Sequence, residues 1–553
     1  MGPVSRAHDS TTSSVVLDSY AAKRCPVRVV FDQIPPPGVK PLDVSPAVEL
    51  RLADGSLFEE QVLSELSNRR EVIEVDDPAP TMEAMVAGAP VIAGGHLPND
   101  LERGRSGRPD LLVRADLPDA DGRWRYYPVE VKAHRVLRRA NGATTYTSAL
   151  TDLRPRAVIA LADVAPIGAR HRENGLQLAH YHRMLQALDR ASSEALGGVI
   201  GRERRLLWLD LQAPDGQRPS LLERYDHLFG QRIDAISAAS EGNSLVEPVK
   251  IRDCDECPWR DHCLPLLAER RCISTVQGIG YRAWRHYRDR GVSTIEELAA
   301  LGQPPDPDDY ALPAELVSQH IDAARALTIA PGSALLRRQL SSLHVARFDR
   351  EIDIDMESEL GGEAYLWGTY EAATGRATVD ADWSPIAPLA SARVFVAFWT
   401  RINQLRADAA AADQSIGFYC WHDDAEKTAL RRGAQAARRV LGHASAPADV
   451  EAFLAEGLII DLCLIAKRDL ITGLSKSLKA VAPLAGFSWR DVDPNGATSM
   501  VWHANAVDPS RTAADQAQWR QRLIDYNEDD VRAEAAVRHW MRTTEFMSAE
   551  ATD

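Results

Sequence analysis

Apolar and polar positions alternate with two different periods between residues 25 and 265. Period-two alternation and short apolar runs at residues 109–113, 126–131 and 205–211 predict β-strands. Residues 54–65 and 175–187 repeat their apolar positions every three to four residues, which predicts amphipathic helices. Strands that alternate with helices in this way are typical of an α/β domain whose sheet is flanked by helices.

A helical pattern follows at residues 269–335. Short apolar segments there surround glycine turns, one of which contains Gly278 and Gly280. We predict a connector that resembles a helix-hairpin-helix, in which the backbone N–H groups of such a turn contact a phosphate. A plain helical connector, whose glycines only end the helices, is the alternative.

A second α/β pattern occupies residues 340–545. Its strands are predicted at residues 351–356, 364–369, 394–398, 415–420 and 458–462, and a long helix at residues 515–541. We therefore expect an N-terminal α/β domain at residues 20–268, the connector, and a C-terminal α/β domain. A disordered tail at residues 1–19 and a second tail at residues 546–553 complete the expected organisation.

The composition, with 45% hydrophobic and 26% charged residues, is that of an ordinary globular protein. The formal net charge of −15 argues against a generally basic nucleic-acid coat, but it suits a nuclease whose carboxylates hold metal ions. No apolar run reaches the roughly 18 residues of a membrane-spanning helix, and the N-terminus has no apolar signal segment. We therefore expect a cytoplasmic protein with no membrane partner.

The first candidate site combines Asp110 with Glu130 and Lys132. The strand period places Glu130 and Lys132 on one face, where two carboxylates can hold a divalent metal ion. The lysine ammonium can then stabilise the charge that develops on a phosphorus centre. Gln177 and Tyr181 are four residues apart on a predicted helix and therefore share one of its faces.

Four of the seven cysteines bracket this site. Cys254, Cys257 and Cys263 lie close together in the sequence, and Cys25 lies near the N-terminus. Four thiolates suit a [4Fe–4S] cluster, which would tie the N-terminal segment to the end of the domain. Zinc held by the same four thiolates is the alternative.

The order of these motifs resembles the RecB-like PD-(D/E)xK nucleases that carry an iron–sulfur staple. The resemblance covers about residues 20–265 and implies a restriction-endonuclease-like fold. It also implies that Asp110 and Glu130 bind Mg²⁺ or Mn²⁺ and that Lys132 assists the attacking water. Gln177 and Tyr181 would support the site and the DNA.

One position departs from that family. The family commonly has a histidine on its first helix, and the corresponding place here is Phe58, followed by Glu59. Glu59 is therefore a candidate replacement ligand, and a glutamate on the helix surface is the alternative.

The second candidate site begins in residues 350–357, where apolar residues alternate with acids. Asp353, Asp355 and Glu357 are expected to share one strand face, where their like charges repel unless a cation neutralises them. Tyr526 and Asp530 are four residues apart on the predicted long helix and point in the same direction.

These two segments resemble the RNase H-like 3′–5′ exonucleases of the DEDDy group, which have D-x-E early and Y-x3-D late. The resemblance implies two metal ions, with Asp355, Glu357 and Asp530 as ligands and Tyr526 orienting the water.

The middle acid of that group has three candidates in this chain. Glu426 is our assignment, and Asp424 and Asp461 are the alternatives. Glu426 would replace the aspartate that the group usually has.

Taken together, the chain resembles a bacterial family of RecB-like nucleases fused to a C-terminal YprB-type RNase H-like domain. We expect an enzyme, a metal-dependent nuclease that hydrolyses DNA, single-stranded or with ends, in repair or nucleic-acid turnover. An RNA-directed 3′–5′ exonuclease is the alternative, and so is a nucleic-acid-binding scaffold with a decayed site. The chain has no GxxxxGK[ST] loop, so a separate helicase is a possible partner.

Overall fold

The computed structural model describes residues 15–214, 216, 218–302, 312–329, 334–337, 342–492 and 496–548. Of the two predicted tails, residues 1–14 and 549–553 lie outside the described residues, and so does the predicted start of the C-terminal domain at residue 340. Residues 15–19 of the first predicted tail are described, and Leu17 and Ser19 among them are buried. Residues 547–548 of the second form a short strand. No helix in the described part of the chain is long and apolar enough to cross a membrane.

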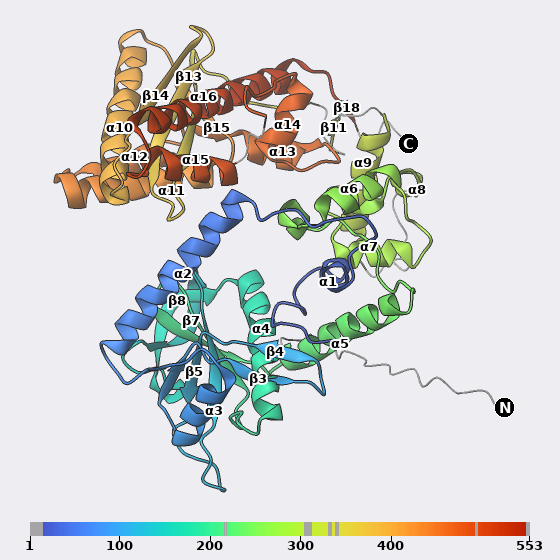
Figure 1. The fold of residues 1–553 in the computed structure, drawn as a ribbon. Coiled ribbons are helices and arrows are strands. Elements are labelled where there is room, and N and C mark those ends of the chain that lie inside the picture. Colours follow the sequence, from blue (N-terminus) through green and yellow to red (C-terminus); the bar gives the residue numbers. More distant parts are fainter. Residues whose placement is uncertain are drawn as a thin grey trace. The chain divides into compact units, whose positions relative to one another are not determined.

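The chain forms two compact units, each of mixed α/β structure (Figure 1). The first contains residues 1–43, 51–248 and 255–259, and the second contains residues 44–50, 249–254 and 260–553. The predicted mixed α/β class is confirmed by the two sheets that the units contain.

The first unit is built on an eight-stranded mixed sheet of order β1-β2-β5-β6-β9-β10-β7-β8. Its strands are β1 (Ile73–Glu74), β2 (Val91–Ala93), β5 (Leu111–Arg114), β6 (Tyr126–Val131), β7 (Leu137–Ala149), β8 (Val158–Pro166), β9 (Leu196–Ile200) and β10 (Arg205–Asp210). Its helices are α1 (Pro26–Gln33), α2 (Pro46–Ser67), α3 (Pro78–Ala87), α4 (Gly168–Ala187) and α5 (Leu221–Ser240), with a short turn η1 (Pro155–Ala157). A separate hairpin consists of β3 (Leu97–Asp100) and β4 (Arg105–Gly107).

Strand β6 is central to this sheet, and all six of its residues are buried. Its Val129 and Val131 pack in one apolar cluster with Phe58 of α2, whereas Tyr126 packs in another cluster with Met184 of α4. Alternate residues of β6 therefore face different helices, as the period-two pattern requires.

Helix α4 approaches the sheet closely because β9 carries glycine where the two elements meet. A Cβ atom added at Gly197 would lie 2.8 Å from the Cβ atom of Leu178. This close packing holds α4 against the sheet near the end of β6 and so positions Gln177 and Tyr181.

The predicted connector is helical. Its range, residues 269–335, contains η3 (Ile273–Thr275), α7 (Tyr281–Arg288), α8 (Ile295–Ala299) and α9 (Ala314–Ile329). The preceding η2 (Arg252–Glu256) and α6 (Arg260–Glu269) belong to the range predicted as the N-terminal domain. Helix α6 and the four connector elements share an apolar cluster, in which Ile273, Leu298 and Ile321 are completely buried. The predicted contact between its glycine turn and a phosphate stays a prediction.

The second unit contains a five-stranded sheet of order β14-β13-β12-β15-β16. Its strands are β12 (Arg350–Ser358), β13 (Ala364–Glu371), β14 (Arg376–Ala381), β15 (Ile416–Cys420) and β16 (Ile459–Asp461). Its helices are α10 (Ala387–Ala411), α11 (Asp423–Ala436), η5 (Ala437–Leu441), α12 (Ala446–Ala455), α13 (Leu462–Asp469), α14 (Leu478–Val481), η6 (Ala482–Ala485), α15 (Gly496–Val507) and α16 (Ala513–Thr543). A small sheet joins β11 (Leu335–Leu336), β17 (Leu470–Ile471) and β18 (Met547–Ser548).

The two faces of β12 have different partners. Ile352 and Ile354 belong to the apolar cluster that α10 and α11 cover, whereas the long helix α16 packs against the acidic face (Figure 1). The alternation of apolar and acidic residues in β12 therefore separates an apolar core from a charged layer.

One predicted strand is wrong. Residues 394–398 lie inside α10, a helix of 25 residues, and not in a strand. The local run of Val394, Phe395 and Val396 favours a strand, but a helical period continues through Ala390, Phe398 and Ile402, which are buried on one side. The ring of Phe398 stacks on Trp367 of β13 at 4.3 Å between centroids, so packing against the sheet decides the conformation.

Candidate metal centres

Asp355, Glu357 and Asp530 form a group whose potential ligand atoms all lie within 4.8 Å of one another. Asp355 and Glu357 project from the same face of β12, and Asp530 comes from α16. Among the described residues, no other group of three or more histidines, cysteines, aspartates or glutamates meets this distance. The sequence prediction that these three acids converge therefore agrees with the geometry.

Neighbouring side chains orient the carboxylates of this acidic trio. Asn527 donates a hydrogen bond from Nδ2 to Asp355 Oδ2 at 2.7 Å, and Ser499 donates from Oγ to Glu357 Oε2 at 2.8 Å. Gly368 lies opposite Asp355 in β13, and a Cβ atom there would come within 1.9 Å of Asn527 Oδ1. Glycine at this position leaves the room in which Asn527 reaches Asp355.

The electrostatics of the trio favour a bound cation. Burial raises the pKa of Asp355 well above its usual value, and the carboxylates of Asp530 and Glu357 raise it further. Burial and the neighbouring Asp530 also raise the pKa of Glu357, to about 8. Carboxylates that raise one another's pKa in this way carry a cost that a divalent cation removes.

Tyr526 and Lys479 complete the surroundings of Asp530. Tyr526 is almost fully buried, and burial together with Asp530 raises its pKa, so its phenol keeps its proton. The Lys479 ammonium forms an ion pair with Asp530 and lies 4.3 Å from the ring centroids of both Tyr526 and Trp489. Trp489 donates from Nε1 to Asp530 Oδ1 at 2.7 Å.

The three candidates for the middle acid have different environments. Glu426 is buried, raises the pKa of Asp355, and has its own pKa raised to about 8 by burial and by Asp461. Asp424 is exposed. Asp461 is occupied as the N-cap of α13, where it accepts the backbone N–H of Leu464 at 2.8 Å. Only Glu426 therefore combines burial with an electrostatic effect on Asp355.

Sequence reasoning missed a further buried acid, Glu534. It lies one helical turn after Asp530, and its Oε1 accepts the backbone N–H of Trp421 at 2.8 Å. Oε2 of Glu534 and Oε2 of Glu426 have no hydrogen-bond partner within the described part of the chain. The sequence does contain a signal for Glu534, because its spacing of four residues from Asp530 places both acids on one face of the helix.

The first candidate site is also brought together, at the end of β6. Asp110 Oδ2 accepts the backbone N–H of Val131 at 2.6 Å, and the Lys132 ammonium forms an ion pair with Glu130. Glu130 is 1% exposed, and its Oε1 has no hydrogen-bond partner among the residues described. Burial and Glu130 raise the pKa of Asp110 well above its usual value. This donor set fits a divalent cation, because a buried carboxylate oxygen is left without a partner.

Gln177 and Tyr181 lie beside this site, as their spacing predicts. The Tyr181 hydroxyl donates to the backbone carbonyl of Arg108 at 3.1 Å and accepts from Gln177 Nε2 at 3.3 Å. Gln177 in turn accepts a hydrogen bond from Lys23 Nζ at 2.9 Å, and Ser19 Oγ lies 3.0 Å from the Tyr181 hydroxyl. The motif analysis missed Ser19 and Lys23, because neither has a local signal that links it to a strand and a helix so far along the chain.

Glu59 is half-buried and lies close enough to the first site to interact with Glu130. Its pKa is raised by burial and by Glu130, whereas Phe58 packs in the apolar cluster around α2. Burial, together with the neighbouring ammonium of Lys132, lowers the pKa of Lys23 to about 8. Glu59, Lys23 and Lys132, which come from three separate segments, therefore all interact electrostatically with Glu130.

The predicted cluster of four cysteines is not assembled in the structure. Cys25 and Cys257 belong to the first compact unit, whereas Cys254 and Cys263 belong to the second. Among the described residues, the cysteines form no group of three or more ligand atoms within the 4.8 Å that the acidic trio satisfies. The boundary between the units passes through the cysteine motif, and its compact spacing in the sequence did not show this.

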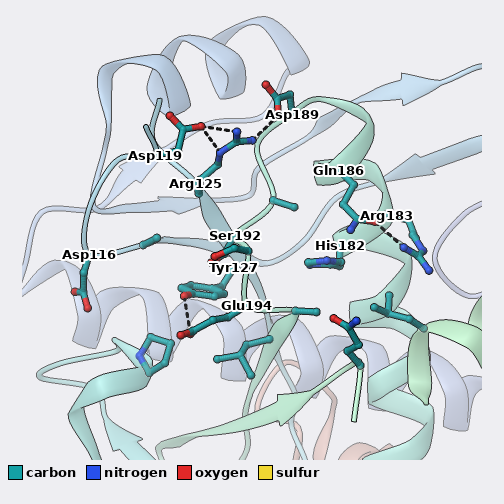
Figure 2. A pocket seen from close by; sticks show the side chains of 18 of the residues that line it. Asp116, Asp119, Arg125, Tyr127, His182, Arg183, Gln186, Asp189, Ser192 and Glu194 are labelled. Atoms are coloured by element: carbon teal, nitrogen blue, oxygen red, sulfur yellow. Dashed lines mark hydrogen bonds and ion pairs between the residues drawn. The ribbon is translucent and has the colours of Figure 1, made fainter. Parts of the chain in front are cut away.

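The first unit also contains a cavity of about 1360 Å³ that is separate from Glu130 (Figure 2). It opens at the beginning of β6, next to Arg125 and Tyr127, whereas Glu130 is near the strand's end. Arg125 is hydrogen-bonded to Asp119 at 2.8 Å and to Asp189 at 2.6 Å. The charge of Arg125 is thus neutralised by two acids of the cavity wall. The cavity therefore does not offer this arginine as part of a basic groove.

Comparison with known proteins concerns only the C-terminal part of the chain. Residues 441–542 match a family model of the RNase H superfamily. This match supports an RNase H-like domain in the C-terminal part of the chain. The matched segment includes Tyr526 and Asp530, which the packing of α16 on β12 brings close to Asp355 and Glu357. A domain of this superfamily indicates nuclease-type activity on nucleic acid. No curated protein and no solved structure matches the chain.

Proposed function

We propose that the protein is a metal-dependent nuclease whose RNase H-like domain removes nucleotides from the 3′ end of a nucleic acid. The observation that carries this proposal is the convergence of Asp355, Glu357 and Asp530 within 4.8 Å in a domain with a superfamily match. Carboxylate oxygens are the ligands that Mg²⁺ and Mn²⁺ prefer, so these three residues would hold the metal.

When bound, the metal supplies activation of water and neutralisation of charge on the phosphate. Asn527 and Ser499 hold Asp355 and Glu357 in orientation through their hydrogen bonds. The phenol of Tyr526 is neutral and lies beside Asp530, so its O–H can donate a hydrogen bond to a water there and orient it. Glu426 is the fourth acid in this proposal, because it is buried and raises the pKa of Asp355.

We propose a second nuclease site of the RecB-like PD-(D/E)xK type in the first unit. Support comes from Asp110, Glu130 and Lys132, which share one electrostatic field at the end of β6. Asp110 and Glu130 would bind the metal, and the Lys132 ammonium would stabilise negative charge on the substrate. Gln177 and Tyr181 support the wall of this site through their hydrogen bonds.

The favoured substrate is DNA, single-stranded or with ends, in repair or in nucleic-acid turnover. RNA is the alternative substrate for the C-terminal domain, since RNase H-like folds act on both polymers. A scaffold protein with one decayed site is the other alternative. The fully assembled acidic trio favours an active C-terminal site over a decayed one.

The experiment uses full-length protein with Mn²⁺ and 5′-labelled single-stranded DNA or RNA. The wild-type protein should produce a ladder of fragments shortened from the 3′ end, and Asp355→Asn should abolish it. Asp408→Asn, which changes an exposed acid on α10, is the matched control and should retain the ladder. A ladder that persists unchanged in Asp355→Asn would contradict the assignment of this site.

A further inference from the structure

A cavity of about 350 Å³ adjoins the acidic trio and is lined by charges of both signs. Asp355 and Asp530 contribute to its wall, together with Lys467, Lys476 and Lys479. The carboxylates of this wall repel one another and favour a cation, whereas the three lysines beside them favour an anion. The cavity is therefore suited to hold an anion next to a cation.

The three lysines differ in what they can contact. Lys476 donates from Nζ to the backbone carbonyl oxygens of Ala466, at 2.7 Å, and Leu470, so it is part of the cavity wall. Lys467 is exposed on α13. Lys479 is the lysine that directly contacts the acidic trio, through its ion pair with Asp530.

The ion pair of Lys479 cannot stay unchanged when a cation binds. Asp530 is a proposed metal ligand, and a divalent cation beside it repels the Lys479 ammonium. The ammonium lies against the rings of Tyr526 and Trp489, and its side chain is 26% exposed, so it can turn toward the cavity without crossing the core.

The formal charges of the metal-loaded site favour the turn of the Lys479 ammonium toward the cavity only when an anion is bound there. One divalent cation and the three ionised carboxylates of the trio sum to a charge of −1, and an ionised Glu426 would bring the sum to −2, which repels a phosphodiester. The ammonium of Lys479 removes one unit of this negative charge. Lys479 thus makes the metal-loaded site more acceptable to an anionic substrate.

We propose that this cavity binds a phosphate group of the nucleic-acid substrate and that Lys479 contacts that phosphate after leaving Asp530. The proposal rests on the proposed function of the acidic trio. It assigns Lys479 two states, paired with Asp530 without metal and paired with phosphate when the metal is bound. Lys479 therefore competes with the cation and cooperates with the anion.

Two binding measurements on the full-length protein test this, and neither depends on catalysis. Titration with Ca²⁺ alone should show tighter binding to Lys479→Gln than to the wild type, because the competing ammonium is absent. Titration with deoxythymidine 5′-monophosphate in saturating Ca²⁺ should show the opposite, a loss of about tenfold or more, the scale of a charged hydrogen bond. Lys479→Arg should keep most of the nucleotide affinity.

Arg431→Gln is the control, since it removes a positive charge from an exposed ion pair between Arg431 of α11 and Glu451 of α12. It should change neither titration. The proposal is overturned if the wild type does not bind the mononucleotide, or if Lys479→Gln matches it in either titration. These binding outcomes are independent of the cleavage test. Persistent trimming by Asp355→Asn would overturn the proposed function, whereas the two titrations measure Ca²⁺ and mononucleotide binding directly and do not require cleavage.

Discussion

Arg538 of α16 forms a two-contact ion pair with Asp353 of β12, with Nη2 and Oδ2 2.6 Å apart and Nε and Oδ1 3.1 Å apart. Asp353 is completely buried, so its charge is neutralised inside the protein. Arg538 lies about two helical turns after Asp530, and the pair therefore holds α16 against β12 where Asp530 meets Asp355. The expectation that Asp353 adds to the repulsion at the metal site is corrected by this pair.

Replacing Arg538 with methionine should destabilise the second unit by about 3–5 kcal/mol, because the buried Asp353 carboxylate would lose its partner. Denaturant unfolding followed by tryptophan fluorescence measures this. The double variant Asp353→Asn/Arg538→Met should recover part of the loss. Equal stability of Arg538→Met and the wild type would show that the pair contributes nothing to holding α16.

The first unit should lose stability in acid because of His180. This residue is completely buried, and it lies between the backbone carbonyl of Ser106 and the Tyr225 hydroxyl, each at 2.9 Å. Burial lowers its pKa to about 4, so the folded state binds fewer protons than the unfolded state. Stability is therefore complete above about pH 6.5 and falls toward pH 4, by about 3 kcal/mol for this group.

Denaturant unfolding at a series of pH values between these limits measures that effect. His180→Gln should reduce the slope without removing it, because burial also lowers the pKa of His182 to about 4. His227→Gln, at an exposed position on α5, should keep the wild-type slope. An unchanged slope in His180→Gln would assign the acid sensitivity to other groups.

Lys132→Ala should slow DNA cleavage by the first unit by about 10²-fold, the scale of a lost transition-state charge contact. The measurement needs Asp355→Asn as background, so that the C-terminal site is silent. Lys40→Ala, at an exposed position of the same unit, is the control. If Lys132→Ala cleaves as fast as the background, the first unit only binds DNA.

Tyr526→Phe should reduce 3′-end trimming less than Asp355→Asn does. It removes one buried hydroxyl, a loss of about 1–3 kcal/mol, and no metal ligand. Ca²⁺ affinity measured by calorimetry should stay at the wild-type value. Trimming at the wild-type rate would remove Tyr526 from the reaction, and weaker Ca²⁺ binding would give it a different task.

Colour tests the finding that the four cysteines form no cluster. Among the described residues, Cys25, Cys254, Cys257 and Cys263 make no group of three or more close ligand atoms, so protein purified without oxygen should be colourless and Cys257→Ser should leave its visible spectrum unchanged. Brown protein that loses its colour in Cys257→Ser, but not in Cys272→Ser, would contradict this finding.

Local patterns in the sequence determine much of the secondary structure and part of the site. Residues 126–131 were predicted as a strand and form β6 with the same bounds, because a short apolar run with period two needs no distant information. The shared direction of Tyr526 and Asp530 follows from helix geometry alone. The same local reasoning is wrong at residues 394–398, where β-favouring residues belong to a much longer helix that packs on the sheet.

The tertiary structure alone decided how the acids are used. Asp353 and Asp355 have the same spacing and chemistry in the sequence, yet Arg538 neutralises the first and Asn527 orients the second. Lys479 has no local signal, because its partner Asp530 is on another helix far along the chain. The charge state of a buried carboxylate depends on the side chains that packing brings to it, and packing joins elements that are remote in the sequence.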